Sequence, residues 1–254
     1  MSLQVLADEV CPVCTERSKP LDAVDFNKSC ITGSSGPLPP SGQPIYYYLC
    51  ESCGFCFAPE IARWPISEFK SRIYNDQYIE VDPDYKGLRP RANAAALIKG
   101  FGGQRSLIRH LDYGGGDGLL SSLLRDDGWD STSYDPFVDF STGIEDLGQF
   151  NLITAYEVFE HVPNPTTLLA EIGALLAHDG MVIFSTLTSD GQIARNQRIS
   201  WWYAAPRNGH ISLFSSRSLL ILARSQGLSL RGSKGLFVMW KTRPEWASRL
   251  VRQG

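Results

Sequence analysis

The sequence predicts an α/β fold, in which a doubly wound sheet is preceded by a small cysteine-rich module. Three observations support this fold class. Strand and helix patterns alternate from residue 106 onward, glycines occupy every second position from 114 to 118, and all six cysteines lie in the first 56 residues. A chain of 254 residues is long enough for one large α/β domain with a small appendage. We expect a cysteine-rich zinc-ribbon-like module at 1–60, a helical linker or lid at 61–105, and the α/β domain at 106–254.

Segments whose apolar residues recur at strand spacing alternate with segments whose apolar residues recur at helix spacing, and this pattern defines the elements of the α/β domain. The expected strands are 106–113, 131–135, 151–156 and 180–186, and the expected helices are 118–127, 164–177 and 215–225. A final antiparallel pair is expected at 228–231 and 235–240. In such a doubly wound sheet, ligands bind outside the carboxyl ends of the strands.

The segment between the cysteines and the α/β domain carries helical patterns. Apolar and aromatic residues recur at helical spacing over 66–78, and an alanine-rich stretch at 92–101 is followed by Gly102 and Gly103. The simplest interpretation is a packing linker. A lid over a substrate pocket is the alternative, because tyrosines such as Tyr74 suit a pocket wall.

Composition argues against several classes of protein. The net charge is −3 and no dense cluster of lysine and arginine occurs, which disfavours nucleic acid as a partner. No apolar run approaches the roughly 20 residues that span a bilayer, and the first ten residues lack the pattern of a secretory signal. We therefore expect a cytoplasmic protein that does not enter the membrane. The oligomeric state is not indicated.

Two C-x-x-C pairs predict a structural zinc site. Cys11 and Cys14 form the first pair, and Cys50 and Cys53 form the second. Each pair can bend into a knuckle that directs two thiolates at one ion, and two knuckles complete a closed Cys₄ site. A redox dithiol, a disulfide, or a second pair made with Cys56 are the alternatives. The missing signal pattern weakens the disulfide.

The glycine-rich loop separates two classes of cofactor. It reads D-x-G-x-G-x-G from Asp112 to Gly118, whereas the dinucleotide fingerprint G-x-G-x-x-G would place a glycine where Leu119 stands. An NAD-dependent oxidoreductase is therefore disfavoured. The loop resembles motif I of the class I S-adenosylmethionine (SAM) methyltransferases.

A second segment resembles the same superfamily. Residues 157–165 read E-V-F-E-H-V-P-N-P, similar to the E-V-x-E-H-x-x-x-P stretch of a group that includes the ubiquinone-biosynthesis O-methyltransferases. The segments 180–186 and 209–215 also fit that group, so the resemblance covers about residues 106–240. It implies a Rossmann-like, seven-stranded methyltransferase sheet and SAM as the methyl donor.

The resemblance also implies which residues bind SAM. The glycine loop would lie against the methionine part, the acid ending the second strand would hold the ribose, and residues after the fourth strand would flank the transferred methyl group. In this sequence these residues are Asp112, Gly114, Gly115, Gly116, Asp135, Ala155, Tyr156 and Glu157. Asp135 could instead be a turn residue before Pro136.

One departure from the family pattern concerns the third strand. Only residues 138–150 separate the second strand's turn from the next strand, so the contact to adenine stays open.

Three residues are candidates for the catalytic chemistry. An acceptor hydroxyl or carbon acid needs a base, and His161 and His210 are the candidate bases. Tyr203 lies in the aromatic segment 201–210, which could stack on an acceptor. Each also has a simpler interpretation, as a loop-stabilising or packing residue. A substrate-binding or a solvated role is equally open for Arg207.

These features together predict a SAM-dependent methyltransferase that acts on a small molecule. A cysteine module ahead of a SAM domain resembles the deoxysugar C-methyltransferases, which suggests a sugar or nucleotide-linked sugar as the acceptor for O- or C-methylation. The alternatives are a catalytically silent SAM-binding protein that docks a partner, and an RNA methyltransferase.

Overall fold

The computed structural model describes residues 6–30, 38–138 and 143–247. The chain forms two compact units. The first comprises Met1–Asp82, Glu160–Thr166 and Leu187–Leu222, and the second comprises Pro83–Phe159, Thr167–Thr186 and Ala223–Gly254. Each unit therefore combines segments that are distant in the sequence.

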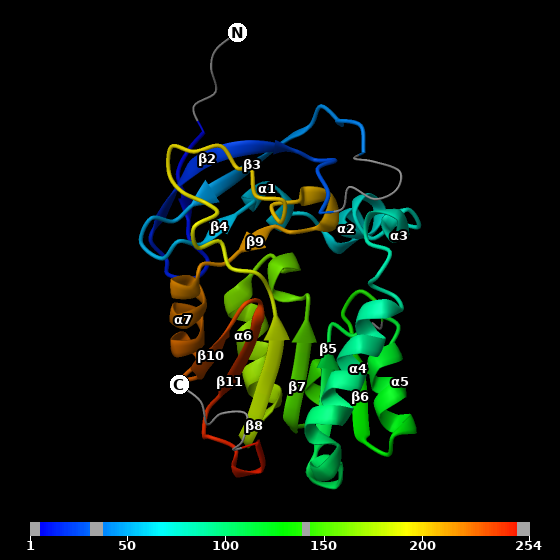
Figure 1. Ribbon diagram of the computed structural model, residues 1–254. Helices are drawn as coiled ribbons and strands as arrows, with labels where there is room; N and C mark the ends of the chain where they lie inside the picture. Colours follow the sequence, from blue (N-terminus) through cyan, green and yellow to red (C-terminus); the bar gives the residue numbers. More distant parts are fainter. Residues whose placement is uncertain (1–5, 31–37, 139–142, 248–254) are drawn as a thin grey trace. The chain divides into compact units, whose positions relative to one another are not determined.

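The first unit contains an antiparallel sheet in the order β1-β2-β3-β4-β9. Its strands are β1 (Glu9–Val10), β2 (Arg17–Asp25), β3 (Pro44–Leu49), β4 (Cys56–Phe57) and β9 (Ser212–Leu213). Its short helices are α1 (Pro59–Ala62), α2 (Ile66–Arg72), α3 (Tyr78–Val81) and η4 (Pro206–Asn208), and most of α7 (Ser216–Ser225) also belongs to it. Figure 1 shows β9, in orange, beside β4, in cyan.

The pairing of β9 with β4 explains why the compact units differ from the expected ranges. Cys56 pairs with Leu213 and Phe57 pairs with Ser212, so a segment from the C-terminal part of the chain completes the sheet of the cysteine module. Phe55 and Phe214, whose ring centroids are 5.0 Å apart, pack beside this junction. The sequence shows no sign of this pairing, because two-residue strands leave no periodic pattern.

The second unit contains a six-stranded sheet in the order β10-β11-β8-β7-β5-β6. Its strands are β5 (Arg109–Tyr113), β6 (Asp130–Tyr134), β7 (Phe150–Tyr156), β8 (Leu176–Ser185), β10 (Ser229–Ser233) and β11 (Leu236–Trp240). The four strands β6, β5, β7 and β8 are parallel, and β11 is antiparallel to both β8 and β10. This arrangement confirms the doubly wound, Rossmann-like fold.

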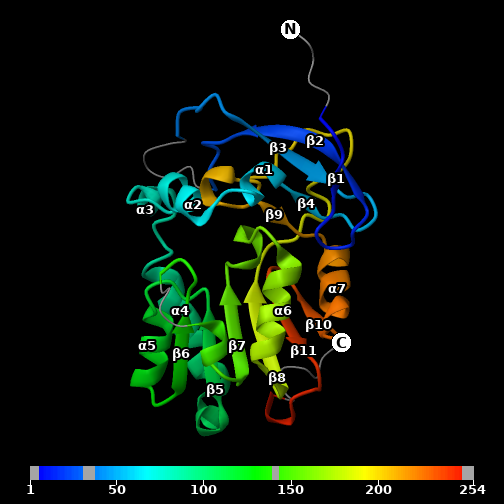
Figure 2. The ribbon, with the colours of Figure 1, turned by 180° about the vertical axis from the view of Figure 1, so that it is seen from behind.

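Helices cover both faces of this sheet. The remaining helical elements are α4 (Leu88–Phe101), η1 (Gly102–Leu107), α5 (Leu119–Asp126), η2 (Ile144–Asp146), η3 (Phe159–His161), α6 (Pro165–Leu175) and η5 (Glu245–Ala247). Helix α4 lies in front of the sheet in Figure 1, and α6 lies in front of it when the molecule is turned by 180° in Figure 2.

Helices α4 and α5 pack on the sheet through the apolar side chains of one face of each helix. Leu120 and Leu124 are four residues apart on α5 and both are buried, and they share a core cluster with Leu97 of α4 and Leu152 of β7. Burying one such side chain contributes about 1.5–3 kcal/mol. The fold thereby fixes the start of α5, and with it the glycine loop that precedes it.

The number of strands is a correction to the expected seven-stranded sheet. Among the described residues the sheet has six strands, and β6 is its edge because it pairs only with β5. The chain between β6 and β7 contains η2 in place of a third strand, and residues 139–142 of that segment lie outside the described part.

Several boundaries also shift. The predicted strand at 106–113 begins only at Arg109, because the residues before it close into η1, and the predicted helix over 66–78 is divided into α2 and α3. Among the described residues, no helix is both long and apolar enough to cross a membrane.

Candidate functional site

Four cysteines of the first unit gather their sulfur atoms in one place. The Sγ atoms of Cys11 and Cys53 are 3.6 Å apart, those of Cys14 and Cys50 are 3.4 Å apart, and all four lie within 4.8 Å of one another. Zinc held tetrahedrally with Zn–S bonds of about 2.3 Å would separate its sulfur ligands by about 3.8 Å. The donor set therefore fits a closed Cys₄ zinc site.

Backbone hydrogen bonds shape each knuckle. The Thr15 N–H donates to the Cys11 carbonyl at 2.9 Å, and the Gly54 N–H donates to the Cys50 carbonyl at 2.7 Å. Both donors have positive φ, +64° at Thr15 and +75° at Gly54. Hydrogen bonding between the Cys11 and Cys53 sulfur atoms lowers the pKa of the Cys11 thiol to about 5, so the geometry favours one thiolate in this pair.

The two remaining cysteines lie outside this group. Cys56 is fully buried in β4, and burial raises the pKa of its thiol. Cys30 Sγ instead lies 3.5 Å from Nδ1 of His210. All six cysteines are described, and no disulfide joins any of them. The structure thus groups the cysteines as Cys11, Cys14, Cys50 and Cys53.

The glycine loop of the second unit connects β5 to α5. Gly114, Gly116 and Gly118 have φ values of +76°, +56° and +81°, which L side chains rarely adopt. A Cβ on Gly115 would lie 2.4 Å from Ser133 Oγ and 2.6 Å from a carboxylate oxygen of Asp112, so no side chain fits there. A Cβ on Gly116 would meet nothing within 4 Å. The loop therefore exposes its backbone to open space at Gly116.

Asp112 lies near the end of β5, and only 4% of it is exposed. The Thr154 hydroxyl donates to its Oδ1 at 2.7 Å. Burial raises the pKa of Asp112 to about 7, the Thr154 hydrogen bond opposes that rise, and the charge of Asp135 adds to it. A buried acid with such a pKa is suited to a cationic group that would stabilise its charged form.

Asp135 follows β6 and binds the glycine loop directly. The Gly116 N–H donates to its Oδ2 at 2.9 Å, and the Phe137 N–H donates to its Oδ1 at 2.8 Å. Asp135 therefore stabilises the turn that follows it, through the Phe137 N–H, and also contacts the glycine loop, through the Gly116 N–H. Each carboxylate oxygen keeps a further lone pair, so the group can still accept hydrogen bonds from hydroxyls.

The residues that end β7 form the third part of this region. Ala155 is fully buried, and Tyr156 lies near enough to Asp112 for its charge to raise the tyrosine's pKa, although burial is the larger cause. Glu157 has a φ of +54°, which is rare for a residue with a side chain. Its N–H donates to Ser185 Oγ at 2.9 Å, and that hydroxyl donates back to the Glu157 carboxylate at 2.7 Å.

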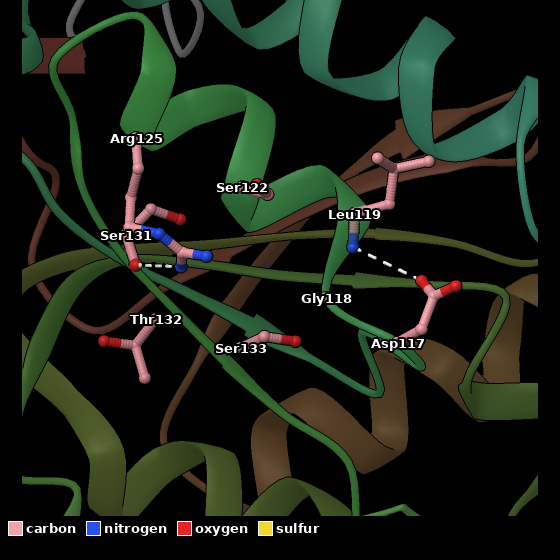
Figure 3. Close-up of a pocket in the computed structure, with 8 residues that line it drawn as sticks. All are labelled: Asp117, Gly118, Leu119, Ser122, Arg125, Ser131, Thr132 and Ser133. Atoms are coloured by element: carbon pink, nitrogen blue, oxygen red, sulfur yellow. Dashed lines mark hydrogen bonds between the residues drawn. The ribbon is translucent and has the colours of Figure 1, made fainter.

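A polar pocket of about 670 Å³, largely open to solvent, lies between α5 and β6 (Figure 3). It is lined by Asp117, Gly118, Leu119, Ser122, Arg125, Ser131, Thr132 and Ser133. Sequence reasoning missed this pocket. The short segment after Asp135 was its signal in the sequence, since among the described residues no strand pairs with the outer edge of β6.

The first unit also brings together the catalytic candidates. Donor atoms of Glu160, His161 and His210 lie within 4.8 Å of one another, and the Tyr203 hydroxyl donates to Glu160. Nδ1 of His210 is 2.8 Å from the backbone carbonyl of Tyr203. A carbonyl only accepts, so Nδ1 carries the proton and Nε2 is the basic nitrogen of the neutral ring. We name Glu160, His161, Tyr203 and His210 the acid–base cluster.

Tyr74 completes the surroundings of the acid–base cluster. Its hydroxyl is 3.1 Å from Nδ1 of His161, and its ring packs edge-on against Tyr78 at a centroid distance of 5.1 Å. The same carboxylate and two imidazoles are also a donor set that divalent metals accept. The cluster can therefore exchange protons or hold an ion.

The segment 201–210 divides into buried and exposed positions. Trp201 and Tyr203 are buried, whereas Trp202 is 52% exposed. Arg207 is also buried and donates to the carbonyl of Ile73 at 2.9 Å and to Asn75 at 3.3 Å. The interpretation of Arg207 as a solvated residue is therefore wrong, because its guanidinium is buried and holds the backbone that follows α2. A substrate-binding role stays a prediction.

The fold, the glycine loop and the acids near it define a class I SAM-dependent methyltransferase. The profile of a family described as "Methyltransferase domain" matches residues 85–231, and the chain belongs to this family.

Curated relatives agree with this assignment. A ubiquinone biosynthesis O-methyltransferase of Bordetella avium is 28% identical over 158 residues, which are 50% of this chain and 65% of that protein. The protein of the same name in Xanthomonas euvesicatoria is 28% identical over 170 residues, 56% of this chain and 71% of that protein. The chain thus spans about two thirds of the length of these relatives.

Solved structures with a similar fold include a methyltransferase of Burkholderia thailandensis that acts on 1,6-didemethyltoxoflavin, with a TM-score of 0.49 and 20% identity over 73% of this chain and 93% of that one. The magnesium protoporphyrin IX methyltransferase of Synechocystis has a TM-score of 0.45 and 14% identity over 72% of this chain and 97% of that one.

Proposed function

We propose that this protein transfers a methyl group from SAM to an oxygen or carbon atom of a small molecule, a sugar or nucleotide-linked sugar. The observation that carries this proposal is the acid–base cluster, which includes a histidine with one defined basic nitrogen. Methyl transfer is an in-line displacement that requires alignment of the acceptor and, for a hydroxyl or carbon acid, removal of a proton. The resemblance of the cysteine module to deoxysugar C-methyltransferases supports the choice of acceptor.

The second unit supplies the residues that would hold SAM. When bound, SAM supplies an electrophilic methyl group on a positively charged sulfur. Gly114, Gly115 and Gly116 keep the backbone accessible, and Asp112 offers a carboxylate for the ammonium group of the methionine part. Asp135, which the loop amide already orients, would accept hydrogen bonds from ribose hydroxyls.

His210 is the base in this proposal. Its Nδ1 proton is held by the Tyr203 carbonyl, so Nε2 takes the proton of the acceptor as the new bond to the methyl carbon forms. Glu160, hydrogen-bonded by Tyr203, would stabilise the resulting imidazolium. The proton thus ends on His210, and the released product is S-adenosylhomocysteine (SAH).

The four clustered cysteines would hold zinc as a structural ion. Four protein ligands leave no open coordination position, so this zinc would organise the first unit and take no part in the chemistry.

The test combines binding and turnover. Titration calorimetry should show that the full chain binds SAH. Methyl-labelled SAM should then label a member of an acceptor panel containing nucleotide-linked sugars, free sugars and RNA. His210→Asn should reduce turnover by about 10²- to 10⁴-fold and leave the SAH dissociation constant unchanged.

His178→Asn is the matched control, because His178 is an exposed histidine of the second unit. SAH binding without labelling of any acceptor would favour a silent SAM-binding protein. Labelling of RNA alone, or full activity of His210→Asn, would contradict the proposal.

A further inference from the structure

A row of polar side chains crosses the interior of the second unit. Nδ1 of His110 lies 2.7 Å from Ser131 Oγ, and its Nε2 lies 3.0 Å from Thr154 Oγ1. The Thr154 hydroxyl lies 2.7 Å from Oδ1 of Asp112. His110 and Thr154 are fully buried, and Asp112 nearly so. A continuous hydrogen-bonded chain therefore connects the core of the sheet to the carboxylate beside the glycine loop.

Strand register places these residues together. His110 pairs with Ser131 across β5 and β6, and Asp112 pairs with Thr154 across β5 and β7. Side chains two residues apart on a strand share a face, so His110 and Asp112 point to the same side of β5. Central strands of a parallel sheet are usually apolar, and a buried imidazole is tolerated only with hydrogen-bond partners.

The protonation state of Asp112 decides which groups donate and which accept along this row of hydrogen bonds. An ionised carboxylate only accepts, so the Thr154 hydroxyl must donate to it and must itself accept from His110. Nε2 of His110 then carries the ring proton, and Nδ1 accepts from the Ser131 hydroxyl.

Protonation of Asp112 reverses each of these bonds. The carboxylic acid donates to Thr154, and the Thr154 hydroxyl donates to Nε2 of His110. The ring proton then resides on Nδ1 and is donated to Ser131 Oγ. The imidazole holds one proton in both states, and only its position differs.

We propose that Ser131, His110 and Thr154 form a reversible hydrogen-bond relay, in which cofactor binding at Asp112 moves the His110 ring proton from Nδ1 to Nε2. The inference rests on the proposed role of Asp112 in holding the ammonium group of SAM. In the overall change, Asp112 releases one proton to solvent and no other group gains or loses charge. His110 and Thr154 are thus positioning residues, which donate toward the carboxylate when cofactor binding has selected its charged form.

The electrostatic surroundings make both states accessible near neutral pH. Burial raises the pKa of Asp112 to about 7, and it faces Asp135 after β6 and Tyr156 at the end of β7. Burial lowers the pKa of His110 to about 3, which keeps the imidazole neutral in both states. A bound ammonium group favours the charged form of Asp112 and so selects one direction of the relay.

Nitrogen-15 NMR of the full chain labelled at histidine reports this switch directly, since protonated and unprotonated ring nitrogens have well-separated shifts. At pH 6, below the pKa of Asp112, the His110 proton should reside on Nδ1. Saturation with SAH, which retains the ammonium group, should move it to Nε2. The same tautomer with and without SAH would overturn the proposal.

Two variants sharpen the measurement. Thr154→Val removes the link, so the His110 tautomer should no longer respond to SAH, and the SAH dissociation constant should rise about 10-fold because a hydrogen bond to a charged group is lost. Asp112→Asn should keep one tautomer at every pH from 5.5 to 8.5. A Thr154→Val protein with wild-type SAH affinity and an unchanged tautomer response would also overturn the relay.

The signal of His110 is identified by its loss in His110→Gln, whose amide can donate and accept in place of the ring. If that variant does not fold, substitution of His161, His178 and His210 in turn assigns the signal by elimination. Failure of the wild-type chain to bind SAH in calorimetry would count against the proposed function, whereas binding with an unresponsive His110 would count against the relay alone.

Discussion

The glycine loop of the second unit and the acid–base cluster of the first differ in how the chain builds them. The loop takes nearly all its residues from one turn, between Asp112 and Gly118, and adds Asp135. The acid–base cluster joins Glu160 and His161 to Tyr203 and His210, more than 40 residues later. The chemistry of a contiguous turn is visible as a motif, whereas the chemistry of the cluster exists only after the first unit has folded. Substitutions in the two regions should therefore have different effects, on the folding of the first unit and on SAH binding by the second.

The largest effect is expected in the first unit from Cys11→Ser. Structural zinc sites contribute about 10–16 kcal/mol of apparent binding energy, so loss of one thiolate should remove about one zinc ion per chain and unfold this unit first. Metal analysis and circular dichroism measure both outcomes.

Cys30→Ser is the matched control, because Cys30 lies outside the four-sulfur cluster. It should retain the zinc. A folded, metal-free Cys11→Ser protein would contradict the structural role. A second equivalent of metal that is lost in His210→Asn would assign an ion to the acid–base cluster.

In the second unit, two neighbouring glycines should respond differently. Gly115→Ala places a methyl group against Asp112 and Ser133, so it should lower both stability and SAH affinity, the latter by about 100-fold or more. Gly116→Val enters open space, so it should cost only about 1–2 kcal/mol of stability for its positive φ yet abolish SAH binding.

Thermal unfolding and calorimetry separate these two effects. If Gly116→Val binds SAH normally, the space beside this residue is not the cofactor site.

The pH dependence of the free energy of unfolding distinguishes Asp112 from the exposed acids. Its folded pKa of about 7 lies above the unfolded value of about 3.9, so its stabilising contribution is complete below pH 4 and is lost as the pH rises through 7. The difference in unfolding free energy between wild type and Asp112→Asn should therefore shift by on the order of 4 kcal/mol, in favour of the variant, between pH 4 and pH 8 without cofactor.

Urea titrations over this pH range measure the shift. Despite its higher stability at pH 8, the variant should bind SAH more weakly. A difference that does not vary with pH would show that folding does not raise the pKa of Asp112.

The smallest effect is expected on the free energy of unfolding, when two arginines of the first unit are substituted in turn. Arg207→Gln leaves the Ile73 carbonyl without its buried donor and should cost about 1–3 kcal/mol. Arg198→Gln removes an ion pair between an exposed guanidinium and Asp22, whose carboxylate keeps its hydrogen bond from the Ile199 N–H, and should cost only about 1 kcal/mol or less. Neither should alter SAH affinity. Equal losses in urea denaturation would contradict a structural role for Arg207.

The parts that the sequence reveals are those with local patterns. The alternation from residue 106 predicted the doubly wound sheet, because each buried strand and amphipathic helix repeats its own apolar period. The C-x-x-C spacing likewise predicted the four-cysteine group that the structure brings together.

The remaining features depend on contacts between distant residues. The pairing of β9 with β4 leaves no periodic signal. The short segment over residues 138–150 indicated that the third strand departs from the family pattern, but it did not indicate η2. The polar row through His110 was also missed, because a histidine within an apolar strand gives no indication of the hydroxyls on neighbouring strands.

The pairing of β9 with β4 has a consequence for synthesis on the ribosome. Residues 212–213 emerge roughly 150 residues after Cys56 and Phe57, a delay of about 10–30 s at ordinary elongation rates. During that interval the outer edge of β4 lacks its native partner, and unpaired edges promote association between nascent chains. All four clustered cysteines have been made by residue 53, so metal can reach them while the rest of the chain is still being translated. Early loading would keep the incomplete sheet together until its last strand arrives.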